Sequence, residues 1–306
     1  MSKGLSDSAK GITRGLCVGL AMAATLLSPS LSFAQTEITA ETASLRVNIA
    51  GRQRMLSQRM AKAACLMSQG ISEVTAFDQM AQAYNLFIVS DDALRNGNPT
   101  LGLPRETLPE VQIAMDNVTP AWMAYRELLE TGIADASFLP NAMEELDTAS
   151  LSVLGNMNRA VFQIAKSYGE LFEDIPLLQN VTVDVAGRQR MLTQRAVKEA
   201  CMMRVADDVT EQSRRLSETV QLFDLSLTAL QLGYDQLGVI PAPTPEIVAK
   251  LEEVRGHWTP IKAVLDRAAS GEVLSDIELE QLARDSEPLL WAMDAAVGLY
   301  EATPPQ

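Results

Sequence analysis

The sequence predicts an all-α protein composed of two tandem antiparallel four-helix bundles related by an internal repeat. Three observations lead to this prediction. The hexapeptide GRQRML occurs at residues 51–56 and again at 187–192. Strand-like alternation is nearly absent, and the helix-forming residues Ala, Leu, Met, Gln and Glu abound. Glycine and proline recur at matching places in both copies, where they separate four helical stretches per copy.

The match between the copies extends well beyond the hexapeptide, without a gap. The recurring pairs are Val47 and Val183, Lys62 and Lys198, Cys65 and Cys201, Phe87 and Phe223, Gly97 and Gly233, Gly102 and Gly238, Pro109 and Pro245, Trp122 and Trp258, and Met157 and Met293. One module has therefore been duplicated, and shared chemistry is expected where the two copies meet.

The helices expected in the first copy cover about residues 43–69, 72–96, 109–132 and 140–173. Ser72 is a suitable N-cap for the second, and the turn residues 96–99 end it. Pro109 suits the first turn of the third helix.

In the second copy the expected helices cover about 181–205, 208–232, 245–269 and 275–301. The proline-rich loop 241–245 is the counterpart of the loop 102–109, so the two copies have the same layout.

Residues 1–34 have the pattern of a secretory signal peptide: a basic start, an apolar stretch over 16–27 and small residues at 32 and 34. We expect cleavage after Ala34, the first bundle over 35–175, the second over 176–306, and a periplasmic location. No later apolar run is long enough to span a bilayer, so no direct membrane insertion is expected after cleavage. The net charge of −14 argues against nucleic acid and anionic membranes as partners.

The short link around Pro176 leaves two arrangements open. If Pro176 turns the chain, the first helices of the two copies lie side by side and parallel, as in a pseudo-twofold dimer within one chain. If Pro176 merely kinks a continuous helix, the bundles stack end to end and share no site.

The first helix of each copy carries a stripe of small and polar residues at heptad spacing, which suits another helix at close range. The stripes are Val47, Gly51, Arg54, Gln58, Ala61, Cys65 and Ser68, and Val183, Gly187, Arg190, Gln194, Val197, Cys201 and Arg204. Glycine inside a helix costs about 1 kcal/mol relative to alanine. We expect Gly51 and Gly187 to let the backbone of another helix approach closely.

If the stripes meet, Arg54 and Arg190 converge, and a small planar oxyanion between them would accept forked hydrogen bonds from both. Gln58 and Gln194 would add neutral donors one turn further on. The alternative is that these two arginines pair with carboxylates of neighbouring helices. For Arg52, Arg59, Arg188 and Arg195 we expect structural ion pairing.

Cys65 and Cys201 are equivalent positions that also fall near each other if the stripes meet. In an oxidising compartment such a pair makes a disulfide possible. Two buried thiols at small-residue packing positions are the alternative.

Residues 48–62, which contain the first GRQRML, resemble the signature of the PilJ-type domain, the N-terminal sensory domain of type IV pilus methyl-accepting chemotaxis transducers. Residues 184–198 are a second match that differs at Thr193, Ala196 and Val197. The motif is also similar to the ligand-binding helix of nitrate/nitrite sensor kinases. That resemblance implies four-helix bundles whose paired first helices hold nitrate between equivalent arginines, here Arg54 and Arg190.

No catalytic, metal or cofactor site is predicted. His257 is the single histidine, and it has no recognisable nucleophile motif beside it. Cys/His metal sites need more ligands than this chain offers, and no haem-attachment, P-loop or dinucleotide motif is present. We therefore expect a protein that is not an enzyme.

These observations predict an exported sensor or binding module that holds nitrate or nitrite between the first helices of the two repeats. We expect its partner to be a membrane-bound signalling protein or a pilus-associated protein. The alternative is a ligand-free helical scaffold linked to type IV pilus or chemotaxis machinery.

Overall fold

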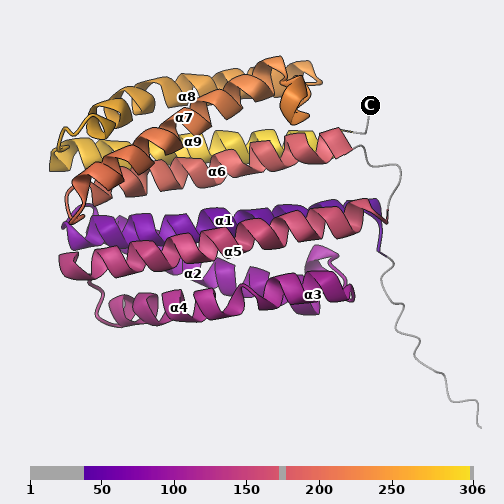
Figure 1. Cartoon of the computed structure of the whole chain (residues 1–306), viewed down its shortest axis with the longest axis horizontal. Helices are drawn as coiled ribbons and strands as arrows, with labels where there is room; N and C mark the ends of the chain where they lie inside the picture. The colour runs from indigo at the N-terminus through magenta and orange to yellow at the C-terminus, as the bar shows by residue number, and fades with distance from the viewer. Residues whose placement is uncertain (1–37, 172–176, 304–306) are drawn as a thin grey trace, which may run out of the picture. The chain divides into compact units, whose positions relative to one another are not determined.

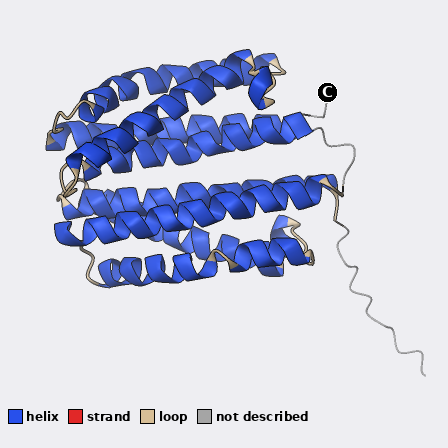
Figure 2. Ribbon diagram, viewed as in Figure 1, coloured by secondary structure: helices blue, strands red, loops and turns tan. Residues whose placement is uncertain are grey.

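A computed structural model describes residues 38–171 and 177–303 of the chain. The expected signal peptide, its cleavage point after Ala34 and the turn at Pro176 lie outside these residues. Within the described part the elements are helices joined by loops and turns, and there is no strand (Figure 2). Isolated bridges join Asn98 to Leu103 and Tyr234 to Val239, at equivalent places in the two copies. The all-α prediction is confirmed.

The first copy folds into one helical bundle (Figure 1). Its elements are α1 (Ala40–Ser68), α2 (Glu73–Asn96), the short 3-10 helix η1 (Pro99–Leu101), α3 (Pro109–Asp116), α4 (Thr119–Ala134), η2 (Pro140–Ala142) and α5 (Met143–Gly169). Helix α1 packs against α2 and α5, and α5 also packs against α3 and α4.

The second copy forms a second bundle with the same order. Its elements are α6 (Leu177–Met202), α7 (Val209–Leu232), η3 (Asp235–Leu237), α8 (Pro245–Ala269) and α9 (Asp276–Ala302). Helix α6 packs against α7 and α9, and α8 packs against both α7 and α9. Two tandem helical bundles are therefore present, as predicted.

The prediction of one continuous helix over 109–132 is wrong, because the chain breaks it into α3 and α4. Pro120 lies in the first turn of α4 and has no N–H to donate to the carbonyl of Asp116, the last residue of α3. In the second copy the equivalent residue is Gly256, and α8 continues through it.

The buried apolar side chains of the two bundles form one continuous core, in which each bundle has an equivalent aromatic pair. Phe87 stacks on Trp122 with ring centroids 4.0 Å apart, and Phe223 lies 3.9 Å from Trp258. All four side chains are buried. These pairs tie the second helix of each copy to the helix that carries the tryptophan.

Helices α1 and α6 run parallel and side by side between the rest of the two bundles (Figure 1). A disulfide joins Cys65 to Cys201 across a sequence separation of 136 residues, with the two Cα atoms 6.2 Å apart. Because the bonded residues are equivalent, the two helices are in register. The side-by-side arrangement holds, and the end-to-end alternative does not.

Candidate functional site between α1 and α6

The two copies of GRQRML face each other across the contact between α1 and α6. Within the motif the glutamine stays inside its own bundle. Gln53 donates to the carbonyl of Phe87 at 2.9 Å, and Gln189 donates to that of Phe223 at 3.0 Å. Both glutamines are fully buried. They fasten the first helix of each copy to its second helix, a role the sequence analysis missed.

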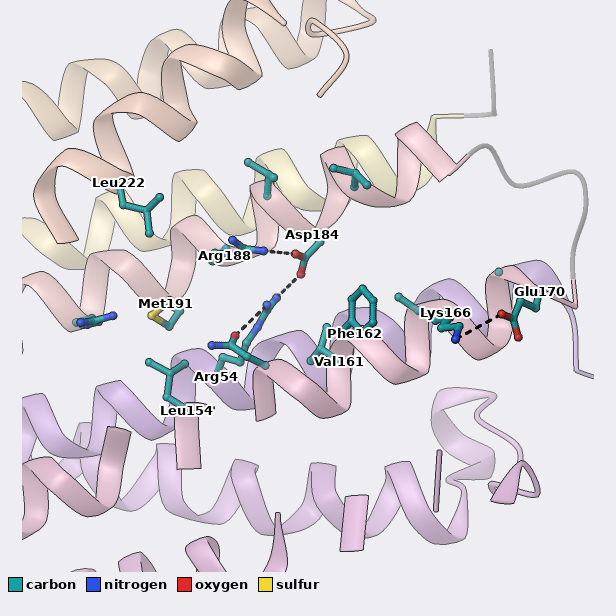
Figure 3. A pocket seen from close by; sticks show the side chains of 16 residues that line it. Arg54, Leu154, Val161, Phe162, Lys166, Glu170, Asp184, Arg188, Met191 and Leu222 are labelled. Carbon is teal, nitrogen blue, oxygen red and sulfur yellow. Dashed lines mark hydrogen bonds and ion pairs between the residues drawn. The ribbon is translucent and has the colours of Figure 1, made fainter. Parts of the chain in front are cut away.

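Arg54 instead reaches across to the other bundle, and only 3% of its side chain is exposed. Its Nη2 donates to Oδ1 of Asp184 on α6 at 2.7 Å, and its Nη1 lies 3.4 Å from Oδ1 of Asn158 on α5. The other oxygen of Asp184 accepts from Arg188 at 2.6 Å. One carboxylate therefore serves two arginines (Figure 3).

Arg190 has the equivalent position and is 2% exposed. Its Nη1 pairs with Asp294 of α9 at 2.6 Å, and its Nη2 donates to Oδ1 of Asn48 on α1 at 2.7 Å. Each arginine thus has one aspartate and one asparagine.

The two sets of partners are exchanged between the halves. Asn48 of α1 is equivalent to Asp184 of α6, and Asn158 of α5 is equivalent to Asp294 of α9. The carboxylate that pairs with Arg54 therefore comes from the other bundle, whereas the carboxylate that pairs with Arg190 comes from the same bundle as Arg190.

The glycines of the motif make room for the two guanidinium groups. A Cβ at Gly187 would lie 3.4 Å from Nη2 of Arg190 and 4.0 Å from Nη2 of Arg54. A Cβ at Gly51 would lie 3.3 Å from Nη2 of Arg54. The two arginines therefore converge beside Gly187.

In this layer, burial and charge pairing shift the pKa values of the buried side chains in opposite directions. Burial by itself raises the pKa of Asp184, but Arg54 and Arg188 outweigh it and hold that pKa below its usual value. Burial lowers the pKa of Arg190 even though Asp294 acts in the other direction. Arg190 still carries its charge at neutral pH, because a guanidinium group is not deprotonated in proteins.

The next layer along the two helices is a network of buried ions. Lys198 is fully buried, pairs with Asp147 of α5 at 2.5 Å and donates to Oε1 of Gln58 at 2.9 Å. Arg215 also pairs with Asp147, at 2.8 Å. Gln58 donates in turn to the carbonyl of Ser150 at 3.1 Å.

The equivalent lysine, Lys62, pairs with Glu287 of α9 at 2.9 Å, and Arg59 binds the same carboxylate at 2.6 Å. Burial lowers the pKa of Lys62 to about 8. The Oε1 of Gln194 lies 3.4 Å from Arg59, and its Nε2 is buried with no hydrogen-bond partner among the described residues. In this structure Gln58 is bound into the ion network, whereas Gln194 keeps one donor unused.

The ion pairing expected for the other motif arginines is observed for three of them. Arg59 pairs with Glu287 of α9, whereas Arg188 and Arg195 pair within α6, with Asp184 and Glu199. The two buried lysines were noted in the sequence only as recurring residues. A lysine that recurs beside the polar stripe in both copies was the available signal for a buried cross-bundle ion pair.

Other kinds of site find no support in the described residues. Across 38–171 and 177–303, no three His, Cys, Asp or Glu side chains gather in a way that would hold a metal ion. None of the helices in those ranges is long and apolar enough to cross a membrane.

Comparison with known families matches two segments of the chain, residues 39–142 and 179–282, to the family described as type IV pili methyl-accepting chemotaxis transducer N-term, or PilJ. Each segment lies within one half of the repeat, and the first ends before α5 whereas the second ends inside α9.

The chain is also similar to the methyl-accepting chemotaxis protein McpN of Pseudomonas aeruginosa PAO1. The two are 30% identical over 121 residues, which cover 40% of this chain and 22% of the relative. The similarity therefore spans less than a quarter of that relative.

Proposed function

Because the chain belongs to the PilJ family of chemotaxis-transducer N-terminal domains, we propose that it is a periplasmic sensory module that binds nitrate or nitrite between α1 and α6. In this proposal residues 1–34 are a cleaved signal peptide, and residues 35–175 and 176–306 are the two PilJ-type bundles. Arg54 and Arg190 hold the anion, Gly51 and Gly187 leave room for it, and Gln58 and Gln194 are adjacent polar residues.

One observation carries the proposal: two buried guanidinium groups lie within 4.0 Å of a single point beside Gly187. Guanidinium forks match planar oxyanions and are strongest where water is excluded. A nitrate ion is planar and singly charged, so it can accept from both arginines at once.

The aspartates explain how the arginines are kept in place without the anion. Asp184 binds both Arg54 and Arg188, so it can keep Arg188 when an anion takes over Arg54. Asp294 is 53% exposed and can turn to solvent when Arg190 is released. In this proposal the anion replaces the side chains of the protein as the acceptor between the two helices.

Binding would be passed on as a movement of α1 against α6. The disulfide between Cys65 and Cys201 ties the two helices together towards their C-terminal ends. A relative shift is therefore largest at the N-terminal ends of α1 and α6, where we place the contact with a membrane-bound signalling partner or a pilus-associated partner.

The second candidate is a ligand-free scaffold, and the existing ion pairs favour it. Each arginine already has an aspartate and an asparagine, which is the arrangement expected if the arginines only hold the bundles together. In that case the partner is another helical protein and no anion is needed.

Titration calorimetry with nitrate, nitrite and chloride separates the two candidates. We expect saturable heat with nitrate or nitrite, weaker heat with chloride, and at least tenfold weaker binding by Arg54→Lys and Arg190→Lys, which keep the charge but lack the fork. Arg284→Lys is the control, because Arg284 lies exposed on α9 and pairs only with neighbours on that helix. Absence of saturable heat with every anion would favour the scaffold.

A further inference from the structure

A groove of about 900 Å³ opens between α5 and α6, next to the arginine layer (Figure 3). Its walls are largely apolar and include Leu154, Val161, Phe162, Val181, Val185 and Leu222. Phe162 is 69% exposed although it stands at this groove. The volume lies within the range of small-molecule sites in proteins, roughly 300–1,000 Å³.

The cations of the groove outnumber the carboxylates that face them. Arg54 and Arg188 share the single carboxylate of Asp184. The Nε of Arg188 is buried and has no hydrogen-bond partner within the described part of the chain. A second pair, Lys166 and Glu170, lies further along the wall and balances itself.

The same place in the other half of the molecule has one more carboxylate. The residues equivalent to Arg54 and Arg188 are Arg190 and Arg52. Asp294 pairs with Arg190, and Glu301 lies close enough to both arginines to interact with them electrostatically. Glu301 reaches from α9 to α1 and accepts from Nδ2 of Asn48 at 3.0 Å. Two cations there meet two anions.

The equivalent of Glu301 on α5 is Ala165, which lines the groove and is too short to reach α6. The first half thus has an apolar groove and lacks one negative charge at the point where the second half supplies its own carboxylate.

From this asymmetry we infer that the groove between α5 and α6 binds a monocarboxylate with an apolar tail. Its carboxylate takes the place that Glu301 occupies in the other half and pairs with Arg188 beside Arg54. Its alkyl or aryl tail lies on the valines of α5 and α6, between Phe162 and Leu222. This ligand is distinct from the oxyanion proposed between α1 and α6, although Arg54 borders both places.

Titration of the full chain with octanoate, butyrate and acetate tests this inference. We expect one saturable site for octanoate, with binding at least tenfold tighter than for butyrate, because each methylene that enters an apolar groove is worth roughly fourfold in affinity. Octanol, which lacks the charge, should bind at least tenfold more weakly than octanoate.

Ala165→Glu gives the groove the carboxylate of the other half and should weaken octanoate at least tenfold. Ser152→Glu adds the same charge at an exposed position of α5 outside the groove and should leave octanoate binding unchanged. Arg188→Gln is the second variant, and it should also weaken octanoate at least tenfold. A thermal melt of each variant checks that the bundles remain folded.

Failure to bind octanoate, equal affinity for octanoate and acetate, or full octanoate affinity in Ala165→Glu would overturn the inference. A nitrate titration of the same preparation keeps the two proposals apart. If nitrate binds and octanoate does not, the inference fails and the oxyanion site stands. If octanoate binds and nitrate does not, the inference stands and the proposed oxyanion site fails.

Discussion

The two halves of this chain share the residues that bring α1 and α6 together and differ in the residues that hold those helices in charge balance. Gly51, Arg54 and Cys65 have identical equivalents in Gly187, Arg190 and Cys201, and these positions lie at the contact between the bundles. The aspartate and asparagine partners of the arginines are exchanged. The residues at the contact are the same in both copies, whereas substitutions beside the contact made the side between α5 and α6 more cationic and more open.

A second difference lies inside the bundles. In the first half Arg46 is buried, pairs with Glu106 at 3.2 Å and donates to the carbonyls of Leu94 and Pro104. Glu106 also accepts from Tyr168 at 2.9 Å. The equivalent of Arg46 in the second half is Thr182, whose hydroxyl accepts from the backbone N–H of Ile240 at 3.1 Å. The first half depends on a buried ion pair, and the second has a neutral hydrogen bond in its place.

The largest expected difference in stability is between variants of this buried ion pair and of its neutral counterpart in the second half. Glu106→Ala leaves Arg46 buried without its carboxylate and should lower the free energy of unfolding by about 3–5 kcal/mol. Thr182→Ala should lower it by only about 0.5–2 kcal/mol. Urea unfolding followed by circular dichroism measures both. Equal losses would mean that the buried pair contributes no more than the neutral bond.

The disulfide should have the next largest effect. Replacing both Cys65 and Cys201 by serine should lower the free energy of unfolding by about 2–4 kcal/mol, because the bond closes a long loop in the unfolded chain. Peptide mapping without reductant should recover the two cysteines in one linked peptide. Free thiols at both positions would contradict the covalent link between the halves.

Acid should loosen the contact between the bundles. Burial alone would raise the pKa of Asp147 and of Glu287. Lys198 and Arg215 outweigh it at Asp147, and Lys62 and Arg59 outweigh it at Glu287, so the pKa of each carboxyl lies below its usual value. A carboxyl group whose pKa is lower in the folded protein stabilises the fold at pH values above its ordinary pKa of about 4. This stabilisation is lost as the pH falls through the pKa that the group has in the folded protein. The effect should be modest because burial opposes the cations.

Urea midpoints between pH 7 and pH 3 test this, and Asp147→Asn removes one of the two groups. We expect the midpoint to fall towards acid in the wild type and to fall less steeply in the variant. An identical slope in both would exclude Asp147 as a source of the acid sensitivity.

The smallest expected effect is the difference in stability gained by Gly→Ala at the contact between α1 and α6 and at positions away from it. Gly155→Ala and Gly298→Ala should stabilise the protein by up to about 1 kcal/mol, since nothing lies within 4 Å of a Cβ at either position. Gly51→Ala should gain less, because the added Cβ would lie 3.3 Å from Nη2 of Arg54. Thermal melts of the three variants measure the difference, and an equal gain at Gly51 would argue against the close approach.

Much of the fold could be predicted because it depends on local patterns. The repeat, the helix ends at Gly97 and Gly233, and the polar stripe on the first helix can all be read from spacing. The break at Pro120 was missed because proline does not break every helix, and α8 and α9 continue through Pro260 and Pro288.

The candidate site was predictable only in part. The convergence of Arg54 and Arg190 follows from the stripe once the helices are parallel. Their partners could not be predicted in this way, because Asp184 and Asn48 lie outside the stripe and Asn158 and Asp294 come from α5 and α9. The groove depends on Ala165 standing where the other copy has Glu301, and that contrast has meaning only once α5 and α6 are known to face each other.

The most direct measurement is a diffraction structure of the protein crystallised with nitrate. We expect a planar ion bound by Arg54 and Arg190 beside Gly187, with Asp184 still bound to Arg188 and no longer bound to Arg54. Arginines that remain paired with Asp184 and Asp294 in nitrate-saturated crystals, with no ion between them, would contradict it.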